Sequence, residues 1–68
     1  MTTENVHNKV ISYEILDAKG DYVTSYSLEL KKNSNGRMDP LKMAKDTLRY
    51  NQEYRLYEVY ENGLRKEI

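Results

Sequence analysis

The chain contains no cysteine, no tryptophan and no phenylalanine, and only one histidine. Without cysteine there are no disulfides, and His7 alone cannot supply the ligand set of a structural zinc ion. A single core in so short a chain supplies only about 3–5 kcal/mol, because a small domain buries a small share of its surface. The chain therefore depends on tight packing or self-association for its stability. Residues 1–8 are polar and are predicted to be a flexible segment, and residues 9–68 are predicted to form one small domain.

Neither sign of charge prevails, since eleven basic side chains face eleven acidic ones. Proteins that bind nucleic acid through its phosphates usually carry a strong positive excess, so this balance argues against a general polyanion binder. The charge is uneven along the chain, because residues 31–49 hold six basic and two acidic side chains. This segment is where a basic patch is expected, and its cations are Lys31, Lys32, Arg37, Lys42, Lys45 and Arg49.

The chain also lacks a long apolar run, and nothing in it approaches the roughly 20 apolar residues needed to span a membrane. The first ten residues, MTTENVHNKV, have neither the basic nor the apolar region of a signal peptide. Together with the absence of cysteine, this predicts a cytoplasmic protein with no membrane partner.

Two segments alternate between apolar and polar residues, which is the pattern of a half-buried strand. They are KVISYEIL, residues 9–16, and YVTSYSLEL, residues 22–30, and the short turn DAKGD with Gly20 separates them. Two alternating runs around such a turn predict a β-hairpin. One face of the second run is expected to carry Tyr22, Thr24, Tyr26, Leu28 and Leu30.

The segment KKNSNGRMDP, residues 31–40, is rich in turn-forming residues and predicts a connector, with a basic binding loop as the alternative. A helix is then expected over MDPLKMAKDTLRYN. Asp39 can cap it by accepting hydrogen bonds from the first free amides, and Pro40 falls at its first position. One apolar stripe at i, i+3 and i+7 is formed by Leu41, Ala44 and Leu48.

The segment EYRLYEVY, residues 53–60, can be interpreted in two ways. Its β-branched and aromatic residues favour a strand, while the spacing of Tyr50, Tyr54 and Tyr57 also permits a continued helix. The strand is preferred because Asn62-Gly63 favours a type I′ hairpin turn, with positive φ at both positions, between strands at about 54–61 and 64–68. The predicted fold class is α+β, a small antiparallel sheet with one helix packed on one face, in the order β-β-α-β-β.

Residues suited to catalysis are scarce. Nucleophilic catalysis needs an activated Ser, Cys, Thr or Lys beside a base, and the only histidine lies in the segment expected to be flexible. Asp17 and Asp21 flank a turn and are interpreted as shaping it, and no segment has the spacing of a calcium or phosphate loop. We therefore expect neither an enzyme nor a bound cofactor or metal ion.

The aromatic side chains are seven tyrosines, a residue type enriched at protein interfaces. This favours a non-enzymatic protein-binding module, with Tyr54, Tyr57 and Tyr60 as candidate contacts. One alternative is a nucleic-acid-binding protein that uses the basic 31–49 segment beside sheet tyrosines. Another is a small homo-oligomeric assembly protein, such as a homodimer formed through a sheet edge or the open sheet face.

In size, polar composition and richness in asparagine, lysine and tyrosine, the chain resembles the small accessory proteins of bacteriophages and other mobile elements. Many such proteins bind and inhibit one host protein. The resemblance rests on composition and assigns no role to any residue. It implies a protein that inhibits or regulates a host protein in the cytoplasm of a bacterial host.

Overall fold

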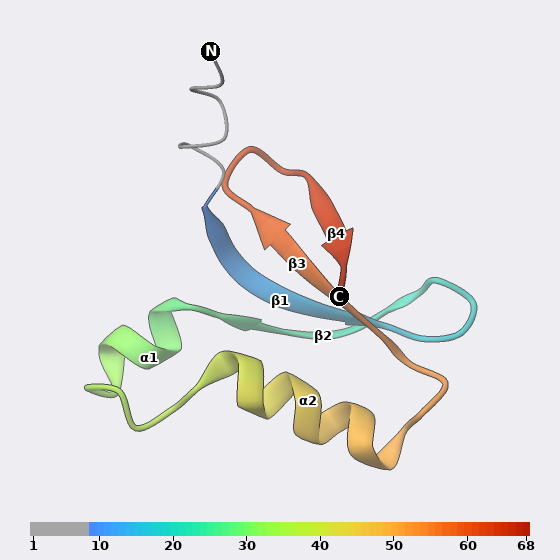
Figure 1. The fold of residues 1–68 in the computed structure, drawn as a ribbon, viewed down its shortest axis with the longest axis horizontal. Coiled ribbons are helices and arrows are strands. Elements are labelled where there is room, and N and C mark those ends of the chain that lie inside the picture. The colour runs from blue at the N-terminus through green and yellow to red at the C-terminus, as the bar shows by residue number, and fades with distance from the viewer. Residues whose placement is uncertain (1–8) are drawn as a thin grey trace.

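A computed structural model describes residues 9–68 as a four-stranded antiparallel sheet with a helix packed against it (Figure 1). The segment 1–8, predicted to be flexible, and its His7 lie outside the described residues. The strands are β1 (Val10–Leu16), β2 (Tyr22–Ser27), β3 (Arg55–Tyr60) and β4 (Arg65–Glu67), and the helices are α1 (Glu29–Asn33) and α2 (Pro40–Tyr50). The predicted α+β class is confirmed, and the structure adds the short α1 to the order β-β-α-β-β.

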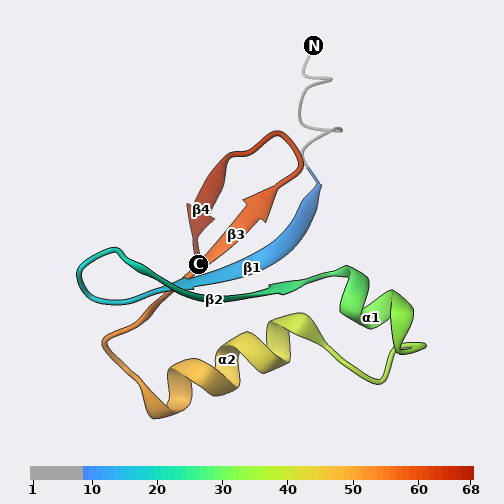
Figure 2. The ribbon, with the colours of Figure 1, turned by 180° about the vertical axis from the view of Figure 1, so that it is seen from behind.

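The sheet joins two hairpins side by side. Its spatial order is β2-β1-β3-β4, so β1 and β3 form the middle and β2 and β4 the edges. The β3 strand confirms the preference for a strand over a continued helix at residues 53–60. Both views of the fold place α2 next to the β1–β2 hairpin, with α1 at the end of β2 (Figures 1 and 2).

The first hairpin turn is held by its backbone and by one carboxylate. The Gly20 N–H donates to the Asp17 carbonyl (2.9 Å), and the Asp17 N–H donates to the Asp21 carbonyl (2.8 Å). The Asp17 side chain accepts hydrogen bonds from the N–H groups of Lys19 and Asp21, both at 2.9 Å. Gly20 has a φ of 89°, a conformation that glycine adopts without steric strain. Asp17 therefore shapes the turn, as its position indicates.

The second hairpin turn repeats this geometry. The Gly63 N–H donates to the Tyr60 carbonyl (2.9 Å), and the Tyr60 N–H donates to the Leu64 carbonyl (2.8 Å). Gly63 has a φ of 91°, whereas Asn62 does not have a positive φ. The predicted type I′ turn is therefore wrong, and the turn is the three-residue kind that ends in a left-handed glycine.

The second strand ends earlier than its alternation predicts. The Ser27 hydroxyl accepts a hydrogen bond from the Glu29 N–H (3.1 Å), and α1 begins at Glu29. A short side-chain bond of this kind competes with strand pairing. Leu28 and Leu30 therefore do not continue the strand, and the predicted 22–30 run is corrected to Tyr22–Ser27.

A bulge also changes the face that one tyrosine occupies. The β1–β2 register pairs Ile15 with Thr24 and then Leu16 with Tyr22, so Val23 is an extra residue in β2. An extra residue reverses the alternation beyond it. Tyr22 consequently lies on the face opposite to Thr24, whereas the sequence places both on one face.

The core is small and lies between α2 and the sheet. Ile15, Ala44 and Leu56 are its buried residues, and the side chains packed against it are Tyr13, Tyr26, Leu41, Leu48 and Tyr54. The predicted cap of α2 is confirmed, because the Asp39 carboxylate accepts hydrogen bonds from two backbone N–H groups of the first turn, at 3.1 and 3.4 Å. Over residues 9–68, neither helix reaches the length and apolar character that crossing a membrane requires.

Candidate functional site

The strand register divides the sheet into two faces with different surroundings. Ile15 pairs with Leu56 on the face that α2 covers, while Glu14 pairs with Tyr57 on the other side. We call the side away from α2 the open face. Alternation and register place on it Ser12, Glu14, Leu16, Tyr22, Ser25, Ser27, Arg55, Tyr57, Val59, Arg65 and Glu67.

Tyr57 lies at the centre of the open face. Its neighbours across the strands are Glu14 on β1 and Glu67 on β4. Tyr57 and Val59 are half-buried although they point away from α2. They form an apolar centre among the charged and hydroxyl-bearing residues of the open face.

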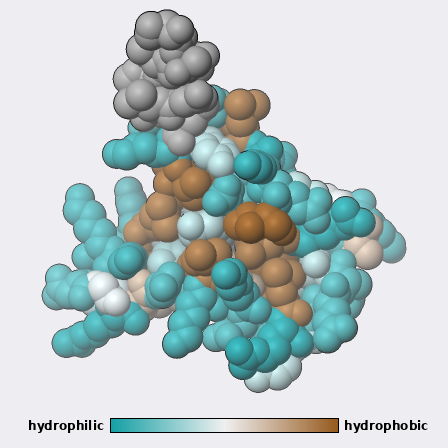
Figure 3. All heavy atoms as spheres, viewed as in Figure 1, coloured by the Kyte–Doolittle hydropathy of each residue, from teal (hydrophilic) through white to brown (hydrophobic). Residues whose placement is uncertain are grey.

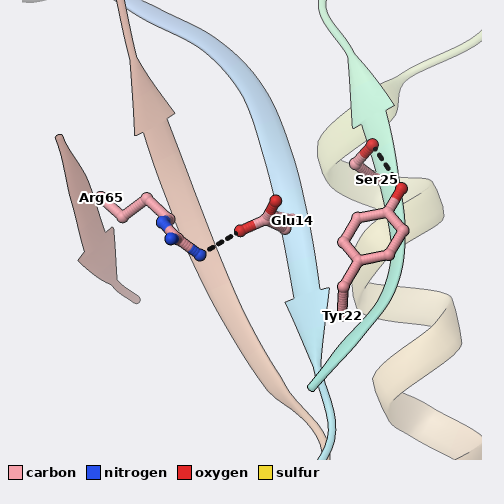
Figure 4. A network of polar contacts seen from close by, with 4 residues as sticks. All are labelled: Glu14, Tyr22, Ser25 and Arg65. Atoms are coloured by element: carbon pink, nitrogen blue, oxygen red, sulfur yellow. Dashed lines mark hydrogen bonds and ion pairs between the residues drawn. The ribbon is translucent and has the colours of Figure 1, made fainter. Parts of the chain in front are cut away.

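Two ion pairs flank this tyrosine. Arg65 Nη1 donates to Glu14 Oε1 at 2.6 Å, an interaction that reaches across β3 from β4 to β1 (Figure 4). Arg55 pairs with Glu67 at 3.7 Å. Both arginines of the open face thus have a carboxylate partner, and the surface around Tyr57 is close to neutral.

A second tyrosine extends the open face toward the first hairpin turn. The bulge in β2 places Tyr22 beside Ser25, and their hydroxyl groups share a hydrogen bond of 3.0 Å (Figure 4). The Tyr22 side chain remains 61% exposed. Tyr22 is therefore more exposed than Tyr57, the other tyrosine of the open face.

The other two predicted contact tyrosines lie elsewhere. Tyr54 is half-buried and packs against the core. Tyr60 donates its hydroxyl to Glu58 Oε1 at 2.7 Å, and Glu58 pairs with Tyr13 on the face that α2 covers. The hydrogen bond to Glu58 raises the pKa of Tyr60, with burial and the Glu58 charge adding to it. Of the three predicted tyrosines, only Tyr57 belongs to the open face.

Tyr13 belongs to the same covered region. Burial raises the pKa of its phenol, and the negative charges of Glu58 and Asp39 raise it further. Both phenols therefore stay protonated over the ordinary pH range and act as neutral packing and hydrogen-bonding groups.

The predicted cations are exposed and fall into two groups. Lys42, Lys45 and Arg49 line a shallow hollow of about 330 Å³ on α2 together with Asp39, Leu41 and Asp46. Asp46 and Arg49 form an ion pair at 3.7 Å. The other three predicted cations do not line the hollow. They are Lys31 and Lys32 on α1 and Arg37 in the loop after it. The basic segment is thus divided, and carboxylates accompany its helical part.

Apolar side chains are also exposed outside the open face. Ile11, Leu64 and Ile68 are each more than two-fifths exposed. The space-filling view shows brown apolar patches interrupted by polar surface (Figure 3). Ile68 continues the β3–β4 pairing, because its N–H donates to the Leu56 carbonyl at 3.0 Å.

The edge strand β2 is a candidate surface that the sequence pattern alone does not single out. Its six residues, YVTSYS, carry no charge, and Val23, Ser25 and Ser27 are exposed. The available signal is that YVTSYS, the first six residues of the predicted 22–30 run, contains β-forming residues and no lysine, glutamate or proline. Recognising it requires knowing that β2 lies at the edge of the sheet, which only the strand order reveals.

Within residues 9–68, no three histidine, cysteine or acidic side chains are grouped so that they could hold a metal ion. The chain matches no known protein-family model, no curated protein and no solved structure.

Proposed function

We propose that this chain is a non-enzymatic protein-binding module whose partner docks on the open face. The observation that carries the proposal is Tyr57, a half-buried tyrosine at the centre of a sheet face that points away from α2. Tyrosine supplies a large contact area together with a hydroxyl that can exchange water for a partner group. Interfaces concentrate their binding energy in such central aromatic residues.

The surroundings of Tyr57 have the composition of an interface. Tyrosine and arginine are enriched where proteins bind one another, and polar residues form the rim that excludes water. The open face has Tyr57 and Val59 at its centre, with Arg55 and Arg65 beside them. The serines of β1 and β2 complete the rim and present hydroxyl groups without bulk.

The charge arrangement favours a protein partner over a nucleic acid. Binding to phosphates requires cations that are not already compensated. The two arginines of the open face are paired with Glu14 and Glu67, and the hollow on α2 includes two aspartates among its lining residues. On both surfaces the cations therefore lie among carboxylates, which weakens their attraction for phosphates.

The kind of partner follows from the resemblance to small accessory proteins of mobile elements. On that basis the partner is a host protein in the cytoplasm of a bacterial host, which this chain inhibits or regulates. A small rigid sheet can act in this way by covering a surface that the host protein needs for its own interactions. No catalytic step is required of the bound chain.

The test is capture of a partner from a nuclease-treated bacterial lysate. The wild-type chain is expected to retain one specific protein, and Tyr57→Thr, which keeps a β-forming residue, is expected to lose it. Tyr50→Thr is the matched control, because Tyr50 is 79% exposed at the end of α2 and lies outside the open face. Equal retention by both variants would overturn the assignment to the open face.

A gel-shift experiment separates the nucleic-acid alternative. If that alternative holds, the affinity falls steeply with added salt, and charge reversal at Lys42, Lys45 and Arg49 abolishes the shift. Loss of every captured protein after nuclease treatment would also favour nucleic acid. The proposed function predicts no shift at low salt.

A further inference from the structure

The two edges of the sheet differ in their protection against pairing with another chain. The β4 edge consists of Arg65, Lys66 and Glu67, which are all charged and exposed. The β2 edge is twice as long and contains neither charge nor proline. Natural sheets block their edges with short strands, charges, prolines and bulges. By these criteria β4 is protected, and β2 has only the bulge at Val23 near one end.

The hydrogen-bond pattern identifies the backbone groups of β2 that face outward. The Leu28 N–H donates to the Ile11 carbonyl of β1 at 2.9 Å. Bonded and non-bonded residues alternate along an antiparallel ladder, so Tyr26 also bonds to β1. The N–H and C=O groups of Ser25 and Ser27 therefore point away from the sheet, and both residues are exposed.

We propose that β2 pairs antiparallel with β2 of a second copy of this chain, about a two-fold axis that passes beside Ser25. The pairing joins two four-stranded sheets into one continuous sheet. In a hydrogen-bonded pair of the new ladder, both residues must point their backbone N–H and C=O groups away from their own sheet. A register centred on Ser25 meets this requirement, because it places Ser25 opposite Ser25 of the second copy. The contact is isologous and closed, so it ends at a dimer.

The side chains of β2 suit this self-pairing. In the register centred on Ser25, Thr24 lies opposite Tyr26 of the second copy, and the reverse pair forms symmetrically. Aromatic and β-branched residues across neighbouring strands stabilise a sheet. No charge opposes a like charge, because β2 carries none. This self-complementarity favours a second copy over an unrelated extended segment, and β4 of a second copy would instead bring three charged residues.

The position of α2 determines what the second copy brings together. The α2 helix packs on one face of β2, β1 and β3, and the hydroxyls of Tyr26 and Thr47 share a hydrogen bond of 3.0 Å that ties β2 to it. A two-fold axis perpendicular to the sheet keeps both α2 helices on one side. It also keeps both open faces on the other side, where they form a single larger surface. The dimer goes beyond the proposed function and does not depend on it, because it rests on the edge strand.

Substitution by proline tests the pairing directly. Ser25→Pro removes an outward N–H, and proline is tolerated in an edge strand when its missing N–H faces solvent. Ser25→Ala is one control, since it removes the hydroxyl and keeps the N–H. Glu67→Pro is the matched control at the other edge: the Ile68 N–H bonds to Leu56, so the Glu67 N–H points outward by alternation.

Sedimentation equilibrium between about 1 μM and about 1 mM is the measurement. The wild type, Ser25→Ala and Glu67→Pro are expected to form a dimer that dissociates on dilution, while Ser25→Pro remains monomeric with an unchanged circular dichroism spectrum. A wild type that is monomeric throughout this range would overturn the proposal. A folded Ser25→Pro variant that still forms the dimer would do so too.

Amide hydrogen exchange of the wild type decides the question if Ser25→Pro does not fold. Protection of the Ser25 and Ser27 amides is expected to rise with protein concentration, because only the second copy can bond to them. The outward amide of Glu67 should show no such rise. Ser25 and Ser27 amides that exchange equally fast at every concentration would rule out pairing through β2.

Discussion

The two faces of the sheet share the same four strands but bury their side chains to different extents. On the covered face, Ile15 and Leu56 pack with Ala44 of α2 and are buried. On the open face, which points away from α2, Tyr57 and Val59 are only half-buried. The two faces can therefore have different roles. The covered face can supply most of the folding free energy, while the open face remains available to the proposed partner.

The two edges show the same separation. One edge ends in a short charged strand, while the other is longer and uncharged. Charge is one of several devices that protect an edge, and only β4 has it. This asymmetry is expected if β2 pairs with a second copy, as proposed.

The largest difference between the faces should appear in folding stability. Ile15 is fully buried, and Ile15→Ala is expected to lose about 2–5 kcal/mol of unfolding free energy. A domain of this size has only about 3–5 kcal/mol in total, so this variant should be largely unfolded. Val59→Ala, at the open face, should lose about 1 kcal/mol. Urea denaturation followed by circular dichroism measures both, and equal losses would show that the open face is part of the core.

A smaller effect is expected from the Glu14–Arg65 ion pair of the open face. Glu14 is 21% exposed and Arg65 is 51% exposed at the side chain, so solvent screens part of the interaction. A double-mutant cycle with Glu14→Gln and Arg65→Gln should give a coupling of about 0.2–1 kcal/mol that decreases with added salt. The longer Asp46–Arg49 pair on α2, at 3.7 Å, is the comparison and should couple less. A Glu14–Arg65 coupling that does not depend on salt would contradict this account of the open face.

The smallest effect is a pH dependence that belongs to the covered face. The pKa of Tyr60 is raised above the ordinary 10.0, mainly by its hydrogen bond to Glu58. Above pH 10 the folded chain keeps a proton that the unfolded chain has released, so the unfolding free energy falls as pH rises. Tyr60→Phe should make this fall less steep in urea denaturation at several alkaline pH values. An identical slope in the variant would show that Tyr60 does not contribute.

Most of the fold follows from local sequence patterns. Alternation predicted the strands, and the capping pair Asp39-Pro40 located the start of α2. The second strand was predicted to be too long for a physical reason, since Leu28 and Leu30 are compatible with both an alternating strand and a short helix. The bond from Glu29 to the Ser27 hydroxyl decides between them. Such a bond competes locally and leaves no periodic signal.

The candidate site was harder to predict, because it depends on which strands are neighbours. Tyr54, Tyr57 and Tyr60 belong to one short segment, yet only Tyr57 lies on the open face. Its neighbours Glu14 and Glu67 come from opposite ends of the described chain. The ion pairs around it follow from the strand order, as does the position of β2 at the edge. The spacing of residues in the sequence predicts neither these ion pairs nor the edge position of β2.

The central claim is that the open face binds a protein, and the most direct test is to map the contact on the captured complex. Isotope-labelled chain is titrated with the captured partner, and the amide resonances are followed by NMR. The account predicts that the signals of Ser12, Glu14, Tyr57 and Val59 shift or broaden while those of residues 42–49 on α2 do not. Changes confined to α2 around Lys42, Lys45 and Arg49, with the open face unaffected, would contradict it.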